Sequence, residues 1–395
     1  MLNFDIKKLR LASSGECEDF LKLVQKNKGR KVKNIELKNL SQFEIYSYLL
    51  ARFGKPNGFQ MLLKAPNANN LIHWHWTLMY DESYIDFIGY LSRSEIIVSQ
   101  INGEIELSNI CSLIQVDVNN YREKIIYLKK EFEKWSLFTN PYARFRTFCD
   151  KINEKIEINS QEIPALLKNP RINLKEKSGQ RSVYSFAKRQ EDHINAMMSL
   201  ASDCLSLNVF LPVMLESFIN LLIFILIKPQ VRKNKRLYDH YLKSPIDVRI
   251  LQLNMQCLGF KGDLDKDDVR FKKFHTLMNA RNNTLHGNVD LNLYKVCNLY
   301  YHDKNIPLFD DISYSDNYPK FLEDSIFRNI PVEKAKMDYK ITLNFIEYVL
   351  ENLEDGKFGQ FIKLLIAKRC LGWDGDRKKV SDLLSDYHVD CFMGS

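Results

Sequence analysis

The sequence predicts an α+β protein with two domains: an N-terminal mixed domain that contains a small antiparallel sheet, and a C-terminal all-α helical bundle. Two observations lead to this prediction. Between residues 59 and 100, β-branched and aromatic residues are separated by turn signals, as in short strands. From residue 193 onward the apolar residues recur with a helical period. We place the boundary in the basic, Pro- and Gly-containing segment 168–190, which gives domains 1–185 and 186–395.

Composition describes a folded protein that can bury a large core. The chain has 395 residues, of which 45% are hydrophobic and 27% are charged. Its eight cysteines are scattered without a Cys-x-x-Cys pair, so we expect reduced thiols in a cytoplasmic protein rather than a disulfide framework or a zinc site. The first residues show no signal-peptide pattern. We expect no cofactor.

The net charge of +8 is unevenly distributed along the sequence. Residues 1–190 contain 30 Lys and Arg against 21 Asp and Glu, whereas residues 191–395 contain 27 against 28. The basic surplus therefore lies in the first half of the chain. We expect this half to contact nucleic acid, and a solvated charged surface is the alternative.

The N-terminal domain is expected to begin with a helix, continue with strands and end with a helix. Ser41 can cap a helix that runs to Phe53, and Glu44 three residues later completes a capping box. Strands are predicted at residues 59–64, 71–80 and 84–99, with helices at 17–24 and 121–157 and a basic connection at 26–38. This order favours a small antiparallel sheet covered by helices.

Two histidines alternate with two tryptophans in the stretch His73-Trp74-His75-Trp76. On a strand, both histidines point to one face and both tryptophans to the other. Two histidines at this spacing could bind a metal ion, but no acidic residue or cysteine is spaced to complete the site. We therefore expect a tryptophan-lined core face opposite two polar residues, and no metal.

The C-terminal domain is expected to be a series of helices. Helices are predicted at 193–228, 234–241, 245–258, 331–354 and 357–369, with a long insertion at 300–330. The acidic loop 262–268 lacks the glycine of an EF-hand at its sixth place, so calcium is not expected.

The segment 205–227 is apolar enough to raise the alternative of a membrane-spanning helix. Asn208, Glu216 and Asn220 interrupt it, and Pro212 lies inside it. Ionisable and amide side chains are costly in a bilayer, so a core helix fits better, and we expect no membrane partner.

The strongest candidate for chemistry is the stretch Asn279-Ala-Arg-Asn-Asn-Thr-Leu-His-Gly287. It places a cation, Arg281, three amides and a proton-transfer group, His286, between an apolar run and a glycine. The pattern Arg281-Asn282-x-x-x-His286 resembles the Arg-x4–6-His motif of the HEPN superfamily, a group of helical-bundle proteins that includes many ribonucleases. The resemblance covers roughly residues 190–370 and rests on this short motif, one upstream glutamate and the helical context.

The resemblance implies a metal-independent endoribonuclease with Arg281, His286, Asn282 and Glu216 as catalytic residues. It implies attack of a ribose 2′-hydroxyl on the phosphate, which gives a 2′,3′-cyclic phosphate. It also implies RNA as substrate, a homodimer that pairs two motifs, and a role in phage defence or as a toxin, with a phage-derived trigger or an antitoxin as further partner. A non-catalytic helical bundle for RNA binding or dimerisation is the alternative.

Two features of the motif leave alternatives open. Arg270 and His275 repeat the Arg-x4-His spacing eleven residues earlier, but they lack the asparagine after the arginine. Glu216 lies among apolar residues and needs a counter-charge, for which Arg281 is the expected partner. The alternative is a purely structural Glu–Arg pair between two helices, with His286 not involved.

Overall fold

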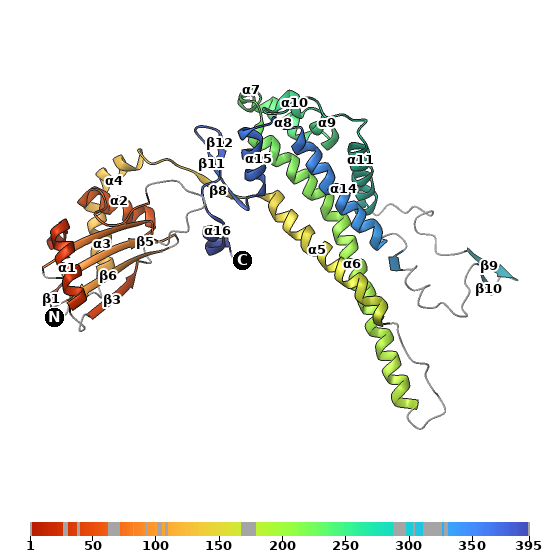
Figure 1. Ribbon diagram of the computed structural model, residues 1–395, viewed down its shortest axis with the longest axis horizontal. Helices are drawn as coiled ribbons and strands as arrows, with labels where there is room; N and C mark the ends of the chain where they lie inside the picture. Colours follow the sequence, from red (N-terminus) through yellow and green to blue (C-terminus); the bar gives the residue numbers. More distant parts are fainter. Residues whose placement is uncertain are drawn as a thin grey trace. The chain divides into compact units, whose positions relative to one another are not determined.

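The computed structural model confirms a mixed α+β protein with an antiparallel sheet in the N-terminal region and a helical part that follows it (Figure 1). The structure describes residues 2–26, 31–37, 40–61, 72–81, 83–91, 93–100, 105–106, 110–166, 179–286, 298–302, 305–310, 326–327 and 331–393.

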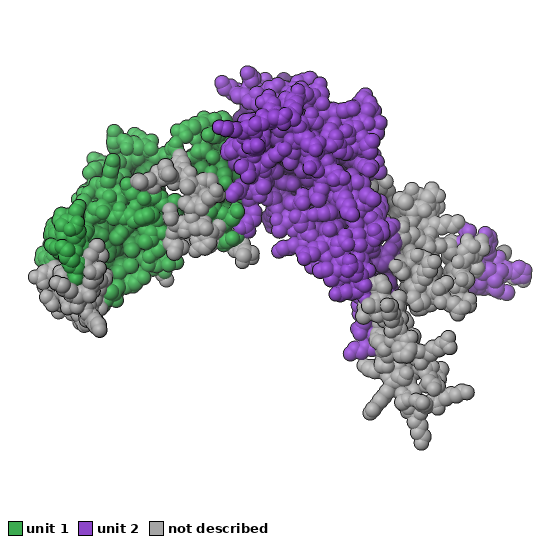
Figure 2. Space-filling model, viewed as in Figure 1, with its two compact units in different colours: residues 1–138, 370–395 green, residues 139–369 purple. Residues whose placement is uncertain are grey.

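The chain forms two compact units, which differ from the predicted domains (Figure 2). Unit 1 comprises Met1–Phe138 and Cys370–Ser395, and unit 2 comprises Thr139–Arg369. The predicted boundary at 185/186 falls inside helix α6 (Gly179–Leu226) and is therefore wrong. The reason is that the predicted linker connects α6 to α5 (Pro141–Leu166), and these two helices pack against each other within unit 2.

Ring contacts show that α5 and α6 run antiparallel. The ring centroids of Tyr142 and Phe218 lie 5.2 Å apart, and those of Phe148 and Phe210 lie 4.8 Å apart. Early residues of α5 thus contact late residues of α6. A break in hydrophobic periodicity can separate either two domains or the two helices of a hairpin, and the break used to predict the boundary separates two packed helices.

Unit 1 is built on a five-stranded antiparallel sheet with the order β2-β4-β5-β6-β3. Its strands are β2 (Arg10–Leu11), β3 (Lys31–Glu36), β4 (Trp74–Tyr80), β5 (Ser83–Gly89) and β6 (Ser94–Gln100). The single strand predicted at 84–99 is two strands, because the chain turns where the Tyr90 N–H donates to the Arg93 carbonyl over 2.9 Å. The basic connection predicted at 26–38 contains β3.

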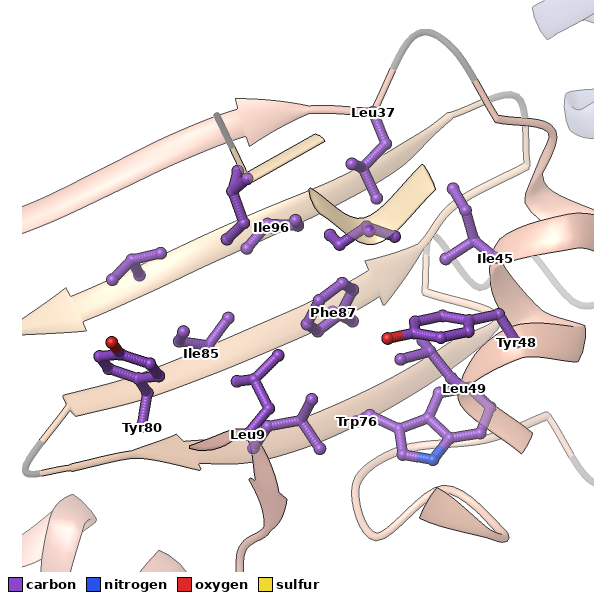
Figure 3. Packing of buried hydrophobic residues seen from close by; sticks show 14 of the residues in the cluster. Leu9, Leu37, Ile45, Tyr48, Leu49, Trp76, Tyr80, Ile85, Phe87 and Ile96 are labelled. Carbon is purple, nitrogen blue, oxygen red and sulfur yellow. The ribbon is translucent and has the colours of Figure 1, made fainter. Parts of the chain in front are cut away.

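The core of unit 1 lies on the face of the sheet that carries both tryptophans, as predicted. Trp76, Phe87 and Ile96 are paired in register across β4, β5 and β6, and all three are buried. Tyr48 and Leu49 of α2 (Gln42–Phe53) pack on them (Figure 3). The predicted capping box of this helix is confirmed, since Ser41 and Glu44 bond each other's backbone N–H groups.

Smaller elements complete this part of unit 1. They are β1 (Leu2–Asn3), which pairs in parallel with β7 (Ile105–Glu106), the 3-10 helix η1 (Ile6–Lys8), and the helices α1 (Ser14–Lys26), α3 (Ile110–Asn120) and α4 (Arg122–Lys129). Buried Ile114 and Ile125 of α3 and α4 join the same core as Trp76.

The last residues of the chain return to unit 1. Strands β8 (Ser136–Thr139), β11 (Cys370–Asp374) and β12 (Lys379–Ser381) form a three-stranded sheet, followed by α16 (Asp386–Met393). The ring of His388 in α16 lies 5.4 Å from that of His73. The expectation that residues 186–395 are all helical is wrong here, because the terminal segment supplies strands to unit 1.

Unit 2 is a bundle of long helices with shorter ones at one end. The long helices are α5, α6, α11 (Val269–His286) and α14 (Val332–Glu351). The shorter ones are α7 (Pro229–Lys233), α8 (Lys235–Lys243), α9 (Ile246–Leu251), α10 (Leu253–Gln256) and α15 (Lys357–Ala367). The predicted irregular insertion includes a hairpin of β9 (Asn298–His302) and β10 (Ile306–Asp310).

Helix α6 lies at the centre of unit 2, in contact with α5, α11 and α14. Leu207, Met214 and Phe218 are buried on it. Among the described residues, one stretch, Glu191–Leu226, is long and apolar enough to cross a membrane by length and composition, and 56% of its most apolar window is buried inside the protein. Contacts on several sides of α6 suit the core helix of a bundle.

Candidate functional site

Helix α11, which carries the candidate motif, is fixed at its start by a capping carboxylate and along its length by aromatic packing. The Asp268 carboxylate accepts the Arg270 backbone N–H over 2.7 Å, which satisfies a free donor of the first turn. Phe271, Phe274 and Met278 are buried on one face. The Phe274 ring stacks on Phe345 of α14 at 4.4 Å, so α11 docks directly on α14.

The predicted catalytic residues of the motif lie on the last turns of α11. The helix includes Arg281, Asn282 and His286, and His286 is its final residue. Their side chains lie outside the described residues. Counting along the sequence, Asn282 and His286 are four residues apart, the spacing of one face of a regular helix, whereas Arg281 and His286 are five apart.

Glu216 of α6 forms an ion pair with Arg249 of α9. The Arg249 Nη2 donates to Glu216 Oε1 over 2.5 Å, and Arg249 Nη1 donates to the Asn220 side-chain carbonyl. The Arg249 side chain is only 7% exposed, whereas Glu216 is 33% exposed. The Tyr241 hydroxyl donates to the Arg249 carbonyl over 2.8 Å. This cluster therefore fastens α9 and α8 to the central helix.

Arg249, which pairs with the candidate residue Glu216, was not named in the sequence analysis. The prediction gave Glu216 a cationic partner but named Arg281, whose side chain lies outside the described residues. The available signal was Arg249 itself, a cation between Val248 and Ile250 in a short helix. A buried arginine needs a carboxylate as much as a buried glutamate needs a cation. Glu216 thus pairs with Arg249, and its predicted pairing with Arg281 stays a prediction.

The second Arg-x4-His pair has structural partners at the protein surface. Arg270 bonds Asp268 Oδ2 over 2.9 Å and Glu351 Oε2 over 3.0 Å, and its guanidinium lies 4.0 Å from the centre of the Tyr348 ring. These hydrogen bonds, above all the one to Asp268, raise the pKa of Arg270 above its usual value. His275 Nε2 lies 3.5 Å from Asp247 Oδ2. Arg270 therefore links α11 to α14, and His275 links it to α9.

The two histidines near β4 have different surroundings. His75 Nε2 lies 2.9 Å from Asp86 Oδ1, and the Thr77 hydroxyl donates to the same oxygen over 2.8 Å. His73 packs on His388, and burial, followed by the neighbouring His388, lowers the pKa of the His73 imidazole. Within the described ranges, no group of three or more His, Cys, Asp and Glu side chains could hold a metal ion.

The division into units changes where the positive charge lies. Unit 1 contains 22 Lys and Arg against 21 Asp and Glu, whereas unit 2 contains 35 against 28. The basic surplus of the N-terminal half comes mainly from residues 139–190, which contain 11 Lys and Arg against 5 Asp and Glu. Residues 139–190 belong to unit 2. Most of the basic surplus of the first half of the chain therefore belongs to the unit that carries the motif, and contact of this half with nucleic acid stays a prediction.

Part of this charge is exposed on α7 and α8. Lys233, Lys235, Arg236 and Lys243 are all exposed. In the part of the chain that the structure describes, no carboxylate lies within ion-pair distance of any of these four side chains. We call these four residues the α8 basic patch. Unpaired surface cations attract polyanions and raise the rate at which such partners bind.

Comparison with known proteins gives no relative: no family model matches this chain, and no curated protein and no solved structure matches it.

Proposed function

We propose that the chain is a metal-independent endoribonuclease in which Arg281 and His286 carry out the chemistry. The proposal rests on one observation above all: the pattern Arg281-Asn282-x-x-x-His286 occupies the last turns of α11 in a helical unit. The resemblance to the HEPN superfamily associates this pattern, in this context, with RNA cleavage. The positive charge of unit 2 and the α8 basic patch support a polyanionic substrate.

The proposed chemistry needs one proton-transfer group and one cation. His286 takes the proton from a ribose 2′-hydroxyl or donates one to the leaving 5′-oxygen, because the ordinary imidazole pKa lies close to neutral pH. Arg281 stabilises the extra negative charge on the phosphorane. The 2′-oxygen forms a bond to phosphorus as the 5′-oxygen leaves, which gives a 2′,3′-cyclic phosphate and a 5′-hydroxyl.

Asn282 and Glu216 have supporting roles in this proposal. Asn282 shares a helix face with His286 and would orient the phosphate or the imidazole by hydrogen bonding. Glu216 would contribute negative charge to the site. A homodimer that pairs two copies of the motif fits the geometry, because residues five apart on one helix, such as Arg281 and His286, do not share a face.

We place this activity in phage defence or toxin action in the cytoplasm, with unit 1 as a regulatory part that responds to a phage-derived trigger or an antitoxin.

The second candidate function is a non-catalytic helical module for RNA binding or dimerisation. One observation favours this second function: the ion pair with Arg249 gives Glu216 a structural role that needs no substrate.

The test is digestion of RNA by the purified full chain in EDTA, followed by mapping of the ends. The proposal predicts cleavage that persists in EDTA, leaves 2′,3′-cyclic phosphate and 5′-hydroxyl ends, and fails where the cut site carries a 2′-deoxyribose. Cleavage that requires a metal ion, or cutting of DNA, would contradict the proposed chemistry. RNA binding without cleavage would favour the non-catalytic module.

A further inference from the structure

The β9–β10 hairpin of unit 2 exposes an unusual amount of apolar surface. Figure 1 labels its two strands, β9 and β10. The strands pair in antiparallel register, with Tyr300 opposite Leu308 and Tyr301 opposite Pro307. Five large apolar side chains are 44–60% exposed: Leu299, Tyr300, Tyr301, Ile306 and Leu308. An isolated two-stranded hairpin is marginally stable in water, and exposed apolar surface of this kind marks an interaction site.

The exposed side chains occupy both faces of the hairpin. Successive residues of a strand point to opposite faces, so Leu299 and Tyr301 lie on one face. Tyr300 and Leu308, which are paired, lie on the other. A helix or a sheet packed on one face would leave the second face exposed. An additional strand at the edge of the hairpin, in contrast, extends the packed surface on both faces at once.

The two edges of the hairpin differ in their ability to accept such a strand. A proline has no N–H, so Pro307 cannot exchange two hydrogen bonds with Tyr301, and this pair is of the non-hydrogen-bonded type. The outward edge of β10 therefore lacks a donor at Pro307 and is poorly suited to pairing. By the same alternation, the N–H and C=O groups of Leu299 and Tyr301 point to the outer edge of β9. Among the described strands, β9 pairs only with β10.

We propose that the outer edge of β9 binds the β9 strand of a second copy of this chain. In an antiparallel pair centred on a two-fold axis, Tyr300 faces Tyr300 of the second copy. Leu299 then faces Tyr301 of the second copy and exchanges both backbone hydrogen bonds with it. The strand is therefore complementary to itself in register, in hydrogen bonding and in apolar side chains.

Charge also favours a second copy as the occupant. Strand β9 (Asn298–His302) contains no Lys, Arg, Asp or Glu, so two identical strands meet without like charges opposite each other. The imidazole of His302 faces Asn298 of the second copy in this register. The resulting four-stranded sheet places Leu299 and Tyr301 of both copies on one face and both Tyr300 rings on the other. The pairing concerns assembly and does not rest on RNA cleavage.

The test is the mass of the full-length protein in solution, measured by sedimentation velocity over a concentration series. The wild-type chain should dimerise. Replacing both Leu299→Lys and Tyr301→Lys sets like charges opposite each other in the pair and should weaken dimerisation at least about tenfold. Replacing both Leu299→Glu and Tyr301→Glu should weaken dimerisation by a similar factor. An equimolar mixture of the lysine and glutamate variants should restore the dimer, which shows that both variants fold. Leu364→Lys, at a residue of α15 that is 64% exposed, serves as the control and should leave the dimer unchanged.

The proposal would be overturned by a wild-type protein that is monomeric across the series, or by a dimer that survives in both charged variants. A mixture that stays monomeric would show that these residues do not face each other across the two-fold axis. RNA cleavage by the same samples distinguishes the two hypotheses, because loss of the dimer with retained cleavage leaves the proposed chemistry intact.

Discussion

At the scale of single residues, the carboxylate of Glu216 has a structural role in unit 2 whether or not it takes part in catalysis. It neutralises Arg249, whose side chain is almost completely buried, and with Asn220 it holds α9 on α6. An arginine in such a place is costly without its counter-charge. Changes at Glu216 must therefore be separated into effects on stability and effects on cleavage.

Glu216→Gln should lower the free energy of unfolding, because the amide still accepts a hydrogen bond but no longer carries the charge that Arg249 needs. Breaking a fully buried pair costs roughly 3–5 kcal/mol. Glu216 is one-third exposed, so we expect a smaller loss of about 1–3 kcal/mol. Urea unfolding measures it. Arg249→Met removes the cation. The double variant, Glu216→Gln with Arg249→Met, should therefore lose less free energy of unfolding than the two single variants lose in sum.

Cleavage by these variants distinguishes the two roles of Glu216. If Glu216→Gln destabilises the protein but cleaves RNA at the wild-type rate under conditions where it is folded, Glu216 is not a catalytic residue. If Arg249→Met cleaves normally while Glu216→Gln does not, the carboxylate contributes to catalysis in addition to its structural pair. Additive losses of stability would contradict a direct interaction between Glu216 and Arg249.

His73 predicts a pH dependence of the stability of unit 1. Burial and the adjacent His388 lower the pKa of the folded-state imidazole below the ordinary value of about 6.5. The unfolded chain then binds more protons than the folded chain as the pH falls through this range. Stability is therefore full above pH about 6.5 and is lost progressively as the pH falls below it. In urea unfolding, His73→Phe should lose less stability than the wild type between pH about 7.5 and about 5.5. An equal loss in both proteins would exclude His73 as the cause.

The candidate site shows what the sequence can and cannot predict at this scale. An isolated glutamate in an apolar helix predicts a cationic partner, and the structure contains one. That Arg249 is such a partner depends on how α9 folds back onto α6, over a separation of 33 residues. No local pattern encodes that contact. The partners of Arg270 and His275, on α14 and α9, depend on tertiary packing in the same way.

At the scale of elements, α7 and α8 carry the four exposed cations of the α8 basic patch, which we propose as a contact for phosphates. Lys235→Glu together with Arg236→Glu should weaken the binding of single-stranded RNA. Each phosphate contact contributes about 0.7 to the slope of log K against log salt for single strands, so the slope should fall by roughly 1.4. Fluorescence anisotropy at several salt concentrations measures the slope. Lys363→Glu, at an exposed lysine of α15, is the matched control. Equal slopes for the wild type and the double variant would remove the α8 basic patch from the RNA-binding surface.

Elements with a strong local signal were predicted well, and those defined by their neighbours were not. The capping box at Ser41 and Glu44 sets the start of α2, and the alternation in His73-Trp74-His75-Trp76 gives the correct core face of β4. Strand β3, Lys-Val-Lys-Asn-Ile-Glu, was missed because the charged residues of an edge strand resemble a connection. The β9–β10 hairpin was missed because Pro307 and the polar residues around it resemble an irregular insertion.

At the scale of the whole molecule, unit 2 is inserted between two parts of unit 1. The sequence predicts two successive domains, because composition changes gradually along the chain and the break at 168–190 is the most conspicuous. The structure closes unit 1 with residues from both ends of the chain, so neither end alone contains its full set of elements. Non-local closure of this kind has no signature in local hydrophobic periodicity.

The most direct test of the central claim compares His286→Ala with His275→Ala in the same RNA cleavage assay, carried out in EDTA. Both histidines lie on α11, but His275 already has a structural partner in Asp247. A positioned proton-transfer group is worth about 10²–10⁴-fold in rate. His286→Ala should therefore lose cleavage by about that factor, and Arg281→Ala should behave similarly, with the fold retained. His275→Ala should cleave at close to the wild-type rate. An inactive His275→Ala together with an active His286→Ala would contradict the assignment of the chemistry to Arg281 and His286.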